Sequence, residues 1–392
     1  MRCCPALSGR SGLGWALPGL GGGLALLLLF GAGCGQVRVD SYGAEGVAPR
    51  SVLQLRWRRK LVHHSLFTYR PEEWASACFG KNGTVYIGSS SGRFLALSPK
   101  GELIWEMRAQ GGISSQPWYN PRSSLIYFGA DDGRLYAVEA ATGKVRWSYA
   151  TKGRIRHKPA YSNGLLLFTS SENRIYAVDA LSGRWRWQYD REHPEGFNIA
   201  GHAGVLLVEG VAYTGFSDGR VVALKAATGE VIWTKNLGEG KSRFVDVDST
   251  PQRLGHGLIL ASSYSGGVFA LTREGGSVSW RKPLAGVTGL SVDGTHVYAA
   301  APTIGLIALD NKGRERWRQA IPSGLPLAPT SMGSFLLVNG TEMGLAVARV
   351  RTGELVQYFD PRQGISAPVA VHRSSIAVLS NGGYLYVFDL LL

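Results

Sequence analysis

A repeat is the feature that most constrains the fold of this chain. Each copy contains an apolar strand, a Gly turn, a second apolar strand, another Gly turn, and a strand with Trp four residues after the second Gly. The clearest copy has this pattern at Tyr127, Gly129, Gly133, Ala137, Gly143 and Trp147. The Trp position recurs through the chain at Trp57, Trp105, Trp147, Trp187, Trp233, Trp280 and Trp317, and Gln357 occupies it in one further copy. The average spacing is about 43 residues, which is the period of a propeller blade.

The ends of the chain indicate how many blades there are and how the ring closes. A small residue and Pro announce one more strand in most copies, at Pro117, Pro159, Pro251, Pro329 and Pro368, so each copy supplies four short strands. The last copy, residues 375–392, ends before its Trp strand, whereas residues 53–58 form a Trp strand with no repeat before it. We therefore predict an all-β, eight-bladed β-propeller of four-stranded antiparallel blades, the last blade being closed by the N-terminal strand.

The first 34 residues predict export. Arg2 and Arg10 precede a short apolar run at residues 24–30 and the small residues at 31–33, as in a signal peptide. The following Cys34 makes the segment resemble a bacterial lipoprotein signal, which implies acylation of this residue. The predicted organisation is a lipoprotein signal peptide at 1–33, a lipidated tether at 34–51 with a reach of roughly 60 Å, and the propeller at 52–392. The alternative is an uncleaved membrane anchor from about Trp15 to Gly33.

Charge and cysteine content fit an exported protein. After removal of the leader, and with Cys34 acylated, Cys78 is the one remaining cysteine, so no disulfide is expected. The net charge is +14, but an exported chain meets no nucleic acid. The basic excess is then interpreted as attraction to anionic lipid headgroups or to an acidic protein surface, or as a solvated surface.

The repeat resembles the pyrroloquinoline-quinone-type propeller repeat, and within that group the chain is similar to the BamB family. Its segment Asp246-Val247-Asp248-Ser249-Thr250-Pro251 is very similar to the acidic loop motif of that family. The resemblance implies that Asp246 and Asp248 bind the periplasmic domains of BamA. It also implies that a second loop contributes Phe197 and Ile199, although Ala200 stands where the family has Arg.

The resemblance implies a non-enzymatic scaffold lipoprotein of the outer-membrane β-barrel assembly machinery. Such a protein is held at the outer membrane by its lipid and faces the periplasm. It docks onto BamA, assists the insertion of outer membrane proteins, and has unfolded outer membrane proteins as possible further partners. No cofactor, metal or catalytic residue is expected.

Other interpretations stay open at the level of sequence. The loops near Phe197 and Asp246 connect neighbouring blades, so they are expected side by side, with two apolar groups and two carboxylates forming an interface. Alternatively, Asp246 and Asp248 cap turns. A quinoprotein dehydrogenase is less favoured, because the adjacent cysteines lie in the leader and the pair His63-His64 lacks a third ligand. A lipid-anchored propeller that binds a cell-wall glycan or another envelope protein is the remaining alternative.

Overall fold

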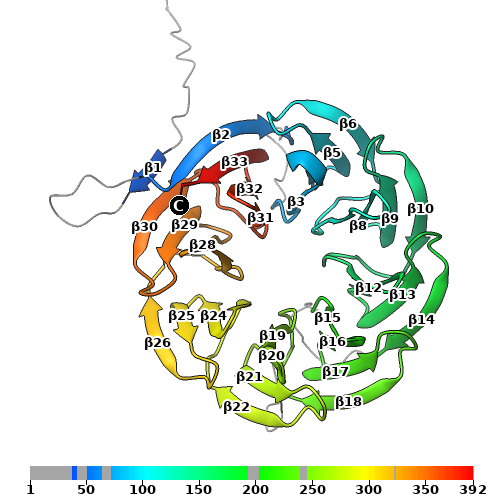
Figure 1. Cartoon of the computed structure of the whole chain (residues 1–392), viewed down its shortest axis with the longest axis vertical. Helices are drawn as coiled ribbons and strands as arrows, with labels where there is room; N and C mark the ends of the chain where they lie inside the picture. The colour runs from blue at the N-terminus through cyan, green and yellow to red at the C-terminus, as the bar shows by residue number, and fades with distance from the viewer. Residues whose placement is uncertain are drawn as a thin grey trace, which may run out of the picture. The chain divides into compact units, whose positions relative to one another are not determined.

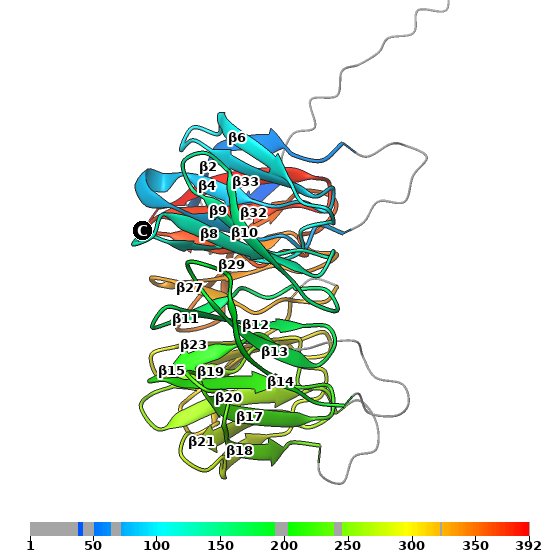
Figure 2. The ribbon, with the colours of Figure 1, turned by 90° about the vertical axis from the view of Figure 1, so that its right-hand side faces the viewer.

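The computed structural model describes residues 38–41, 51–63, 72–192, 203–238, 245–321 and 324–391. Residues 37–392 form one compact unit. Within the described part, eight antiparallel sheets follow one another around a ring, shown face-on in Figure 1 and from the side in Figure 2. The one helical element in that part is a 3-10 turn at Lys81–Gly83.

Each sheet is a blade whose first strand lies nearest the ring centre. Blades 1 to 4 are β3(Ala77–Phe79), β4(Val85–Ile87), β5(Arg93–Leu97), β6(Leu103–Arg108); β7(Trp118–Asn120), β8(Leu125–Gly129), β9(Arg134–Glu139), β10(Val145–Ala150); β11(Ala160–Ser162), β12(Leu165–Ser170), β13(Arg174–Asp179), β14(Trp185–Asp190); and β15(Leu206–Val208), β16(Val211–Gly215), β17(Arg220–Lys225), β18(Val231–Asn236). Blades 5 to 7 are β19(Gln252–Leu254), β20(Leu258–Ser263), β21(Gly267–Thr272), β22(Val278–Lys282); β23(Gly289–Asp293), β24(His296–Ala301), β25(Gly305–Leu309), β26(Glu315–Gln319); and β27(Thr330–Met332), β28(Phe335–Val338), β29(Leu345–Arg349), β30(Leu355–Asp360).

Blade 8 closes the ring with strands from both ends of the chain. It consists of β31(Ala370–His372), β32(Ser375–Leu379), β33(Tyr384–Leu390) and the N-terminal strand β2(Leu53–Lys60). In the antiparallel register of β2 and β33, Leu53 pairs with Leu390 and Lys60 with Tyr384. This pairing confirms the predicted eight-bladed fold and its closure, and Figure 1 shows the first and last parts of the propeller side by side.

The repeated Trp residues join one blade to the next. The indole N–H of Trp187 donates to the carbonyl oxygen of Ala226 in the following blade at 3.1 Å. A Cβ built on Gly229, at φ +77°, would lie 2.6 Å from the same indole ring. The other six Trp residues donate in the same way to Pro99, Ala140, Ala180, Arg273, Asn311 and Val350. The Trp and Gly of the repeat are therefore partners across blades, which explains why both recur.

The segment expected to be a tether contains a strand. β1(Arg38–Ser41) pairs antiparallel with β30 and becomes a fifth strand on the outer edge of blade 7. Its register runs from Arg38 opposite Asp360 to Ser41 opposite Gln357. The signal peptide and Cys34 lie outside the described residues. Among the described residues, no helix is long and apolar enough to span a membrane.

Candidate partner-binding site

The acidic segment lies between the outer strand of blade 4 and the inner strand of blade 5. Its centre is the buried Val247, whose N–H donates to the carbonyl oxygen of Phe216 at 3.2 Å. Val247 packs so closely over Gly215 that a Cβ there would lie 2.2 Å from its Cγ1. Ile113 and Ile155 occupy the same place over Gly88 and Gly129 in other blades. The glycine at the end of the second strand therefore makes room for an apolar anchor of the incoming connection.

Asp248 follows this anchor and lines the central cavity of the ring. The equivalent positions after Ile113 and Ile155 are Ser114 and Arg156, which line the same cavity. The Oδ1 atom of Asp248 is buried and accepts no hydrogen bond within the described part of the chain. Burial, and then the nearby Asp246, raise the pKa of the Asp248 carboxyl to about 7. Asp248 is therefore a carboxyl group that changes its charge near neutral pH.

Asp246 is placed differently from what the sequence suggested. We expected both carboxylates at an interface rim, but the Asp246 side chain is only 1% exposed. Its carbonyl oxygen accepts the N–H of Tyr264 at 3.2 Å, and the carbonyl oxygen of Val245 accepts the Ser263 hydroxyl at 2.9 Å. Asp246 therefore lies inside the segment, which is tied to the end of β20. Successive side chains point in alternate directions here, so Asp246 and Asp248 flank the anchor Val247.

The residues after Asp248 fasten the segment to the neighbouring blade. Ser249 and Ser262 share a hydrogen bond between their hydroxyl groups at 2.5 Å. The Thr250 hydroxyl oxygen accepts the N–H of Gly204 at 3.0 Å, which joins the two connections on either side of blade 4. No described residue donates a backbone cap to Asp248 Oδ1, so these hydroxyl groups hold the turn.

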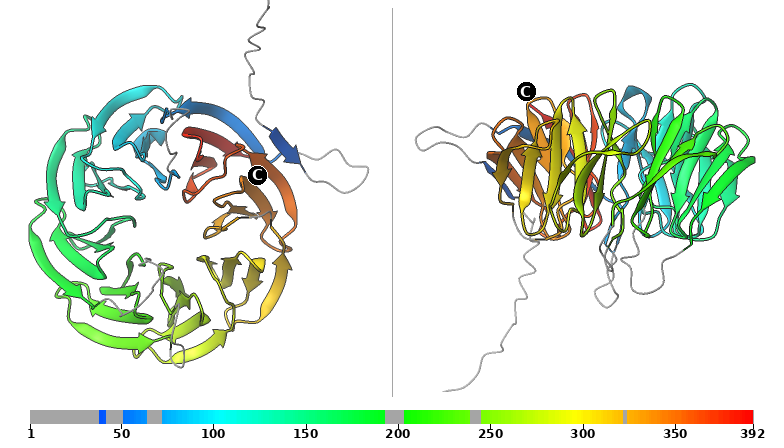
Figure 3. Two further views of the ribbon diagram at one scale, coloured as in Figure 1. Left: turned by 180° about the vertical axis from the view of Figure 1, so that it is seen from behind. Right: turned by 90° about the horizontal axis from the view of Figure 1, so that it is seen from below.

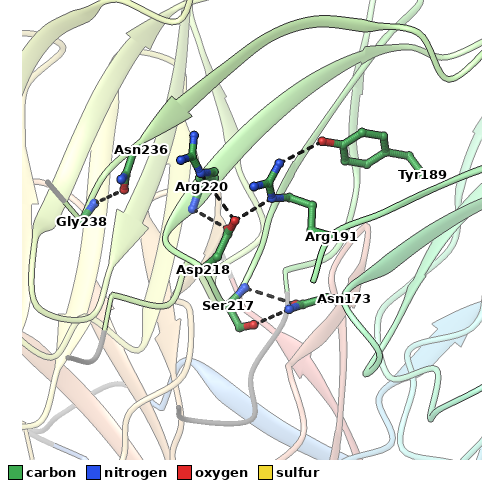
Figure 4. Close-up of polar contacts among 8 residues, drawn as sticks. All are labelled: Asn173, Tyr189, Arg191, Ser217, Asp218, Arg220, Asn236 and Gly238. Atoms are coloured by element: carbon green, nitrogen blue, oxygen red, sulfur yellow. Dashed lines mark hydrogen bonds and ion pairs between the residues drawn. The ribbon is translucent and has the colours of Figure 1, made fainter. Parts of the chain in front are cut away.

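A polar network holds the chain where the two predicted docking loops begin (Figure 4). Arg191, just after blade 3, donates through Nε to Asp218 at 2.6 Å and through Nη1 to the Tyr189 hydroxyl at 3.2 Å. One connection later, the N–H of Gly238 donates to the Asn236 side chain at 2.9 Å. The predicted docking residues Phe197 and Ile199, and Ala200, lie outside the described residues. The structure thus fixes the stems of both connections around blade 4.

The central cavity has a volume of about 860 Å³ and is more basic than acidic. Arg156, His157 and Lys158 line it together on the connection into blade 3, and Asp248 is its one acidic lining residue in the described part. Lys158 is open to the cavity yet surrounded by protein, and this desolvation lowers its pKa. Sequence reasoning did not identify these three residues as lining the same cavity as Asp248. Aligning the positions after each apolar anchor could have found them.

Among the described residues, no three side chains of His, Cys, Asp or Glu form a group that could hold a metal ion. His63 is exposed, and His64 lies outside the described residues. Asp131 and Asp132 serve turns and neighbouring polar groups, as in the 2.9 Å hydrogen bond from the Arg134 N–H to Asp132.

A family model, a curated relative and a solved structure that are similar to this chain all carry the name BamB. The family model described as outer membrane protein assembly factor BamB matches residues 122–319. The curated outer membrane protein assembly factor BamB of Salmonella typhimurium is 30% identical over 294 residues, covering 70% of this chain and 74% of that protein. The crystal structure of BamB from Moraxella catarrhalis has a TM-score of 0.74 at 20% identity and covers 86% of this chain and 100% of that one. Quinohemoprotein alcohol dehydrogenase from Comamonas testosteroni shares the fold, with a TM-score of 0.66 at 17% identity, over 86% of this chain and 76% of that one.

Proposed function

Because this chain belongs to the BamB family of outer membrane protein assembly factors, we propose that it is a scaffold of the outer-membrane β-barrel assembly machinery. In this role it docks onto the periplasmic domains of BamA, assists insertion of outer membrane proteins, and catalyses no reaction. It is anchored to the outer membrane through acylated Cys34 and faces the periplasm. Unfolded outer membrane proteins are possible further partners.

One observation carries the docking proposal. The segment 245–250 is held firmly between blades 4 and 5 while it places the Asp248 carboxyl at the cavity. A preorganised carboxyl costs little entropy when it pairs with a cationic partner group. This segment also lies within the part of the chain that matches the family model.

The two acidic residues have different proposed roles. Asp248 is the residue that contacts BamA, because its carboxyl reaches the cavity. Asp246 is a positioning residue, since it is buried within the segment and cannot touch a partner without local opening. Phe197 and Ile199 are proposed to supply the apolar part of the same interface, as the family resemblance implies.

Binding of a 35–392 fragment to the periplasmic domains of BamA from the same organism tests the proposal. The fragment retains all eight sheets, which lie within the compact unit. We expect Asp248→Ala to weaken binding by roughly 1–3 kcal/mol, as for an interface anchor, and Asp293→Ala, which removes an exposed carboxylate in blade 6, to leave binding unchanged. Asp246→Ala should weaken binding together with the thermal stability of the fragment.

The outcomes separate the possible functions. No binding by the parent at high micromolar concentration would remove BamA docking and direct attention to glycan and quinone binding. Binding that is unaffected by Asp248→Ala would keep the scaffold role but place its interface elsewhere on the propeller. A parallel assay of Phe197→Ala with Ile199→Ala tests the second loop in the same way.

A further inference from the structure

We propose that the outer rim formed by β1, β30 and β2 is the membrane-facing edge of the propeller and binds anionic lipid headgroups. The proposal rests on the lipid anchor at Cys34 in the function proposed above. It adds an orientation and a lipid-binding surface to that function. Two features support it: the short length of chain between the lipid and the propeller, and the charge of strand β2.

The pairing of β1 shortens the distance between the lipid and the propeller. Cys34 is four residues before Arg38, which is paired with Asp360 on the outer edge of blade 7. Four residues span roughly 14 Å at full extension, whereas a tether free up to residue 51 would span roughly 60 Å. Figures 1 and 3 show β1 at the outer rim, next to β30 and the start of β2. An acyl chain on Cys34 therefore keeps this part of the rim close to the membrane surface.

The adjacent strand β2 has an unusual charge. It carries four cationic residues and no acidic residue in the sequence Leu-Gln-Leu-Arg-Trp-Arg-Arg-Lys. None of the other outer strands, β6, β10, β14, β18, β22, β26 and β30, has more than two cationic residues. The most cationic outer strand thus begins next to β1 and carries its cations further along the same rim (Figure 1), and such a local excess of cations attracts an anionic surface.

Two of these four cations, Arg58 and Lys60, are available to a partner. Arg56 is held by Asp389, and Arg59 donates to the carbonyl oxygen of Gly101 at 2.7 Å. Arg58 and Lys60 are exposed and lie over the Tyr384 ring, with Lys60 Nζ 5.3 Å from the ring centroid. Within the described residues, neither Arg58 nor Lys60 forms an ion pair. The aromatic ring orders both cations without neutralising them.

This orientation is compatible with docking onto BamA. When the outer rim of the propeller faces the membrane, neither flat face of the ring contacts the membrane. The connections around blade 4 and the central cavity lined by Asp248 then remain open to a periplasmic partner. The membrane rim and the docking site are therefore separate surfaces, and each can be removed without the other.

Vesicle binding by the unlipidated 35–392 fragment tests the surface independently of acylation and of BamA. The probes are vesicles of phosphatidylglycerol with phosphatidylcholine and vesicles of phosphatidylcholine alone. We expect binding to the anionic vesicles only, weakening as salt is raised. Arg58→Gln with Lys60→Gln should lower the partition coefficient by about 25-fold, because each cation near such a surface contributes about a factor of five.

A matched control removes the same charge elsewhere. Lys144 and Arg184 are exposed in the turns before the outer strands of blades 2 and 3. Lys144→Gln with Arg184→Gln should bind the anionic vesicles as the parent does. Equal losses in the two double variants, no binding by the parent, or equal binding to neutral vesicles would each overturn the proposal. Unchanged near-ultraviolet circular dichroism establishes that the variants are folded.

The role of β1 is tested with the full lipidated chain in the same anionic vesicles. A donor dye at Gln54→Cys, on β2, should transfer energy to a headgroup acceptor more efficiently than a dye at Arg184→Cys. Val39→Pro with Asp40→Pro removes strand hydrogen bonds and should reduce transfer from position 54. Equal transfer from both dye positions would overturn the orientation. A chain that lacks the lipid would instead fail to remain with the vesicles at high salt, which reports on the anchor and not on the rim.

Discussion

Gln357 holds the point at which the ring closes, by accepting the backbone N–H of Leu53 through Oε1 at 2.8 Å. The same oxygen accepts the N–H of Val52 at 2.7 Å, and Nε2 donates to the Ser51 hydroxyl at 2.9 Å. Gln357 is fully buried and occupies the position that is Trp in the other seven blades. At this junction the outer strand of the following blade comes from the other end of the chain. A side-chain amide can satisfy its free N–H groups, whereas an indole, which only donates, cannot.

Loss of this amide should therefore destabilise the whole ring. We expect Gln357→Ala to lower the free energy of unfolding by about 2–4 kcal/mol, since two N–H groups lose their acceptor. Urea unfolding followed by Trp fluorescence measures the change. Gln188→Ala, an exposed glutamine on the outer strand of blade 3, should stay within about 0.5 kcal/mol of the parent. Equal effects of the two changes would argue against a special closing role.

The contact between Trp and Gly across blades makes a second prediction. Gly229→Ala adds a Cβ that would meet the Trp187 ring at 2.6 Å, in a backbone with φ +77°. Gly210→Ala meets nothing within 4 Å at φ +79°. We expect a loss of about 1 kcal/mol for Gly210→Ala from the backbone alone, and of about 2–4 kcal/mol for Gly229→Ala with the added clash. Thermal unfolding of both variants separates the two costs.

Asp248 should make stability depend on pH in an unusual direction. Its native pKa is about 7 and its ordinary value 3.8, so between these values the native state binds more protons than the unfolded state. The contribution of the Asp248 carboxyl to the free energy of unfolding therefore falls as pH rises from about 3.8 to about 7, and it is constant above that range. We expect Asp248→Asn to be more stable than the parent by about 1–2 kcal/mol at pH 8, after allowance for screening by cavity water, and equal to it near pH 4. Denaturant titrations at both pH values check this, with Asp293→Asn as control.

Binding to BamA should depend on the same ionisation. If a cationic group of the partner pairs with Asp248, it holds the carboxylate ionised, so that binding releases a proton. We expect affinity to rise by up to about tenfold between pH 6 and 8, following the ionised fraction. Asp248→Asn should bind more weakly and lose most of this dependence. Calorimetry in buffers of different ionisation enthalpy measures the proton release directly.

The free cysteine should be unreactive in the folded protein. Cys78 packs against the cluster that contains Tyr86 and Phe94, and burial raises its pKa to about 12. Because the thiolate is the reactive form, we expect no measurable alkylation of the native 35–392 fragment by iodoacetamide at pH 8. Rapid alkylation should follow unfolding in urea. Native-state labelling as fast as that of the Arg184→Cys variant would show that the site is open.

Much of the fold follows from the sequence because a propeller is built from local signals. The Gly and Trp positions of one repeat predict its turns and outer strand, and their period gives the blade. The missing last strand and the orphan strand containing Trp57 predict closure, which the pairing of β2 with β33 confirms. The acidic segment was recognisable through its resemblance to the acidic loop motif of the family.

The environment of each carboxyl could not be read from the sequence. Asp246 and Asp248 look alike in the sequence, yet one is buried inside its connection and the other lines the cavity. These positions depend on contacts with other strands, such as Val247 over Gly215 and the hydrogen bonds from Ser263 and Tyr264 to residues 245 and 246. Similarly, Arg156 and Lys158 share a cavity with Asp248 because the connections into all eight blades line it.

The number of blades, their strand order and the means of closure follow from the sequence, because they depend on spacings along the chain. The structure was needed to find that β1 pairs with β30, that the Gln357 amide binds the backbone of the N-terminal strand at the junction, and that burial raises the pKa of Asp248. Each of these depends on groups brought together from distant positions. Their effects on hydrogen bonding and hydration arise from burial in the assembled ring, which no local pattern encodes.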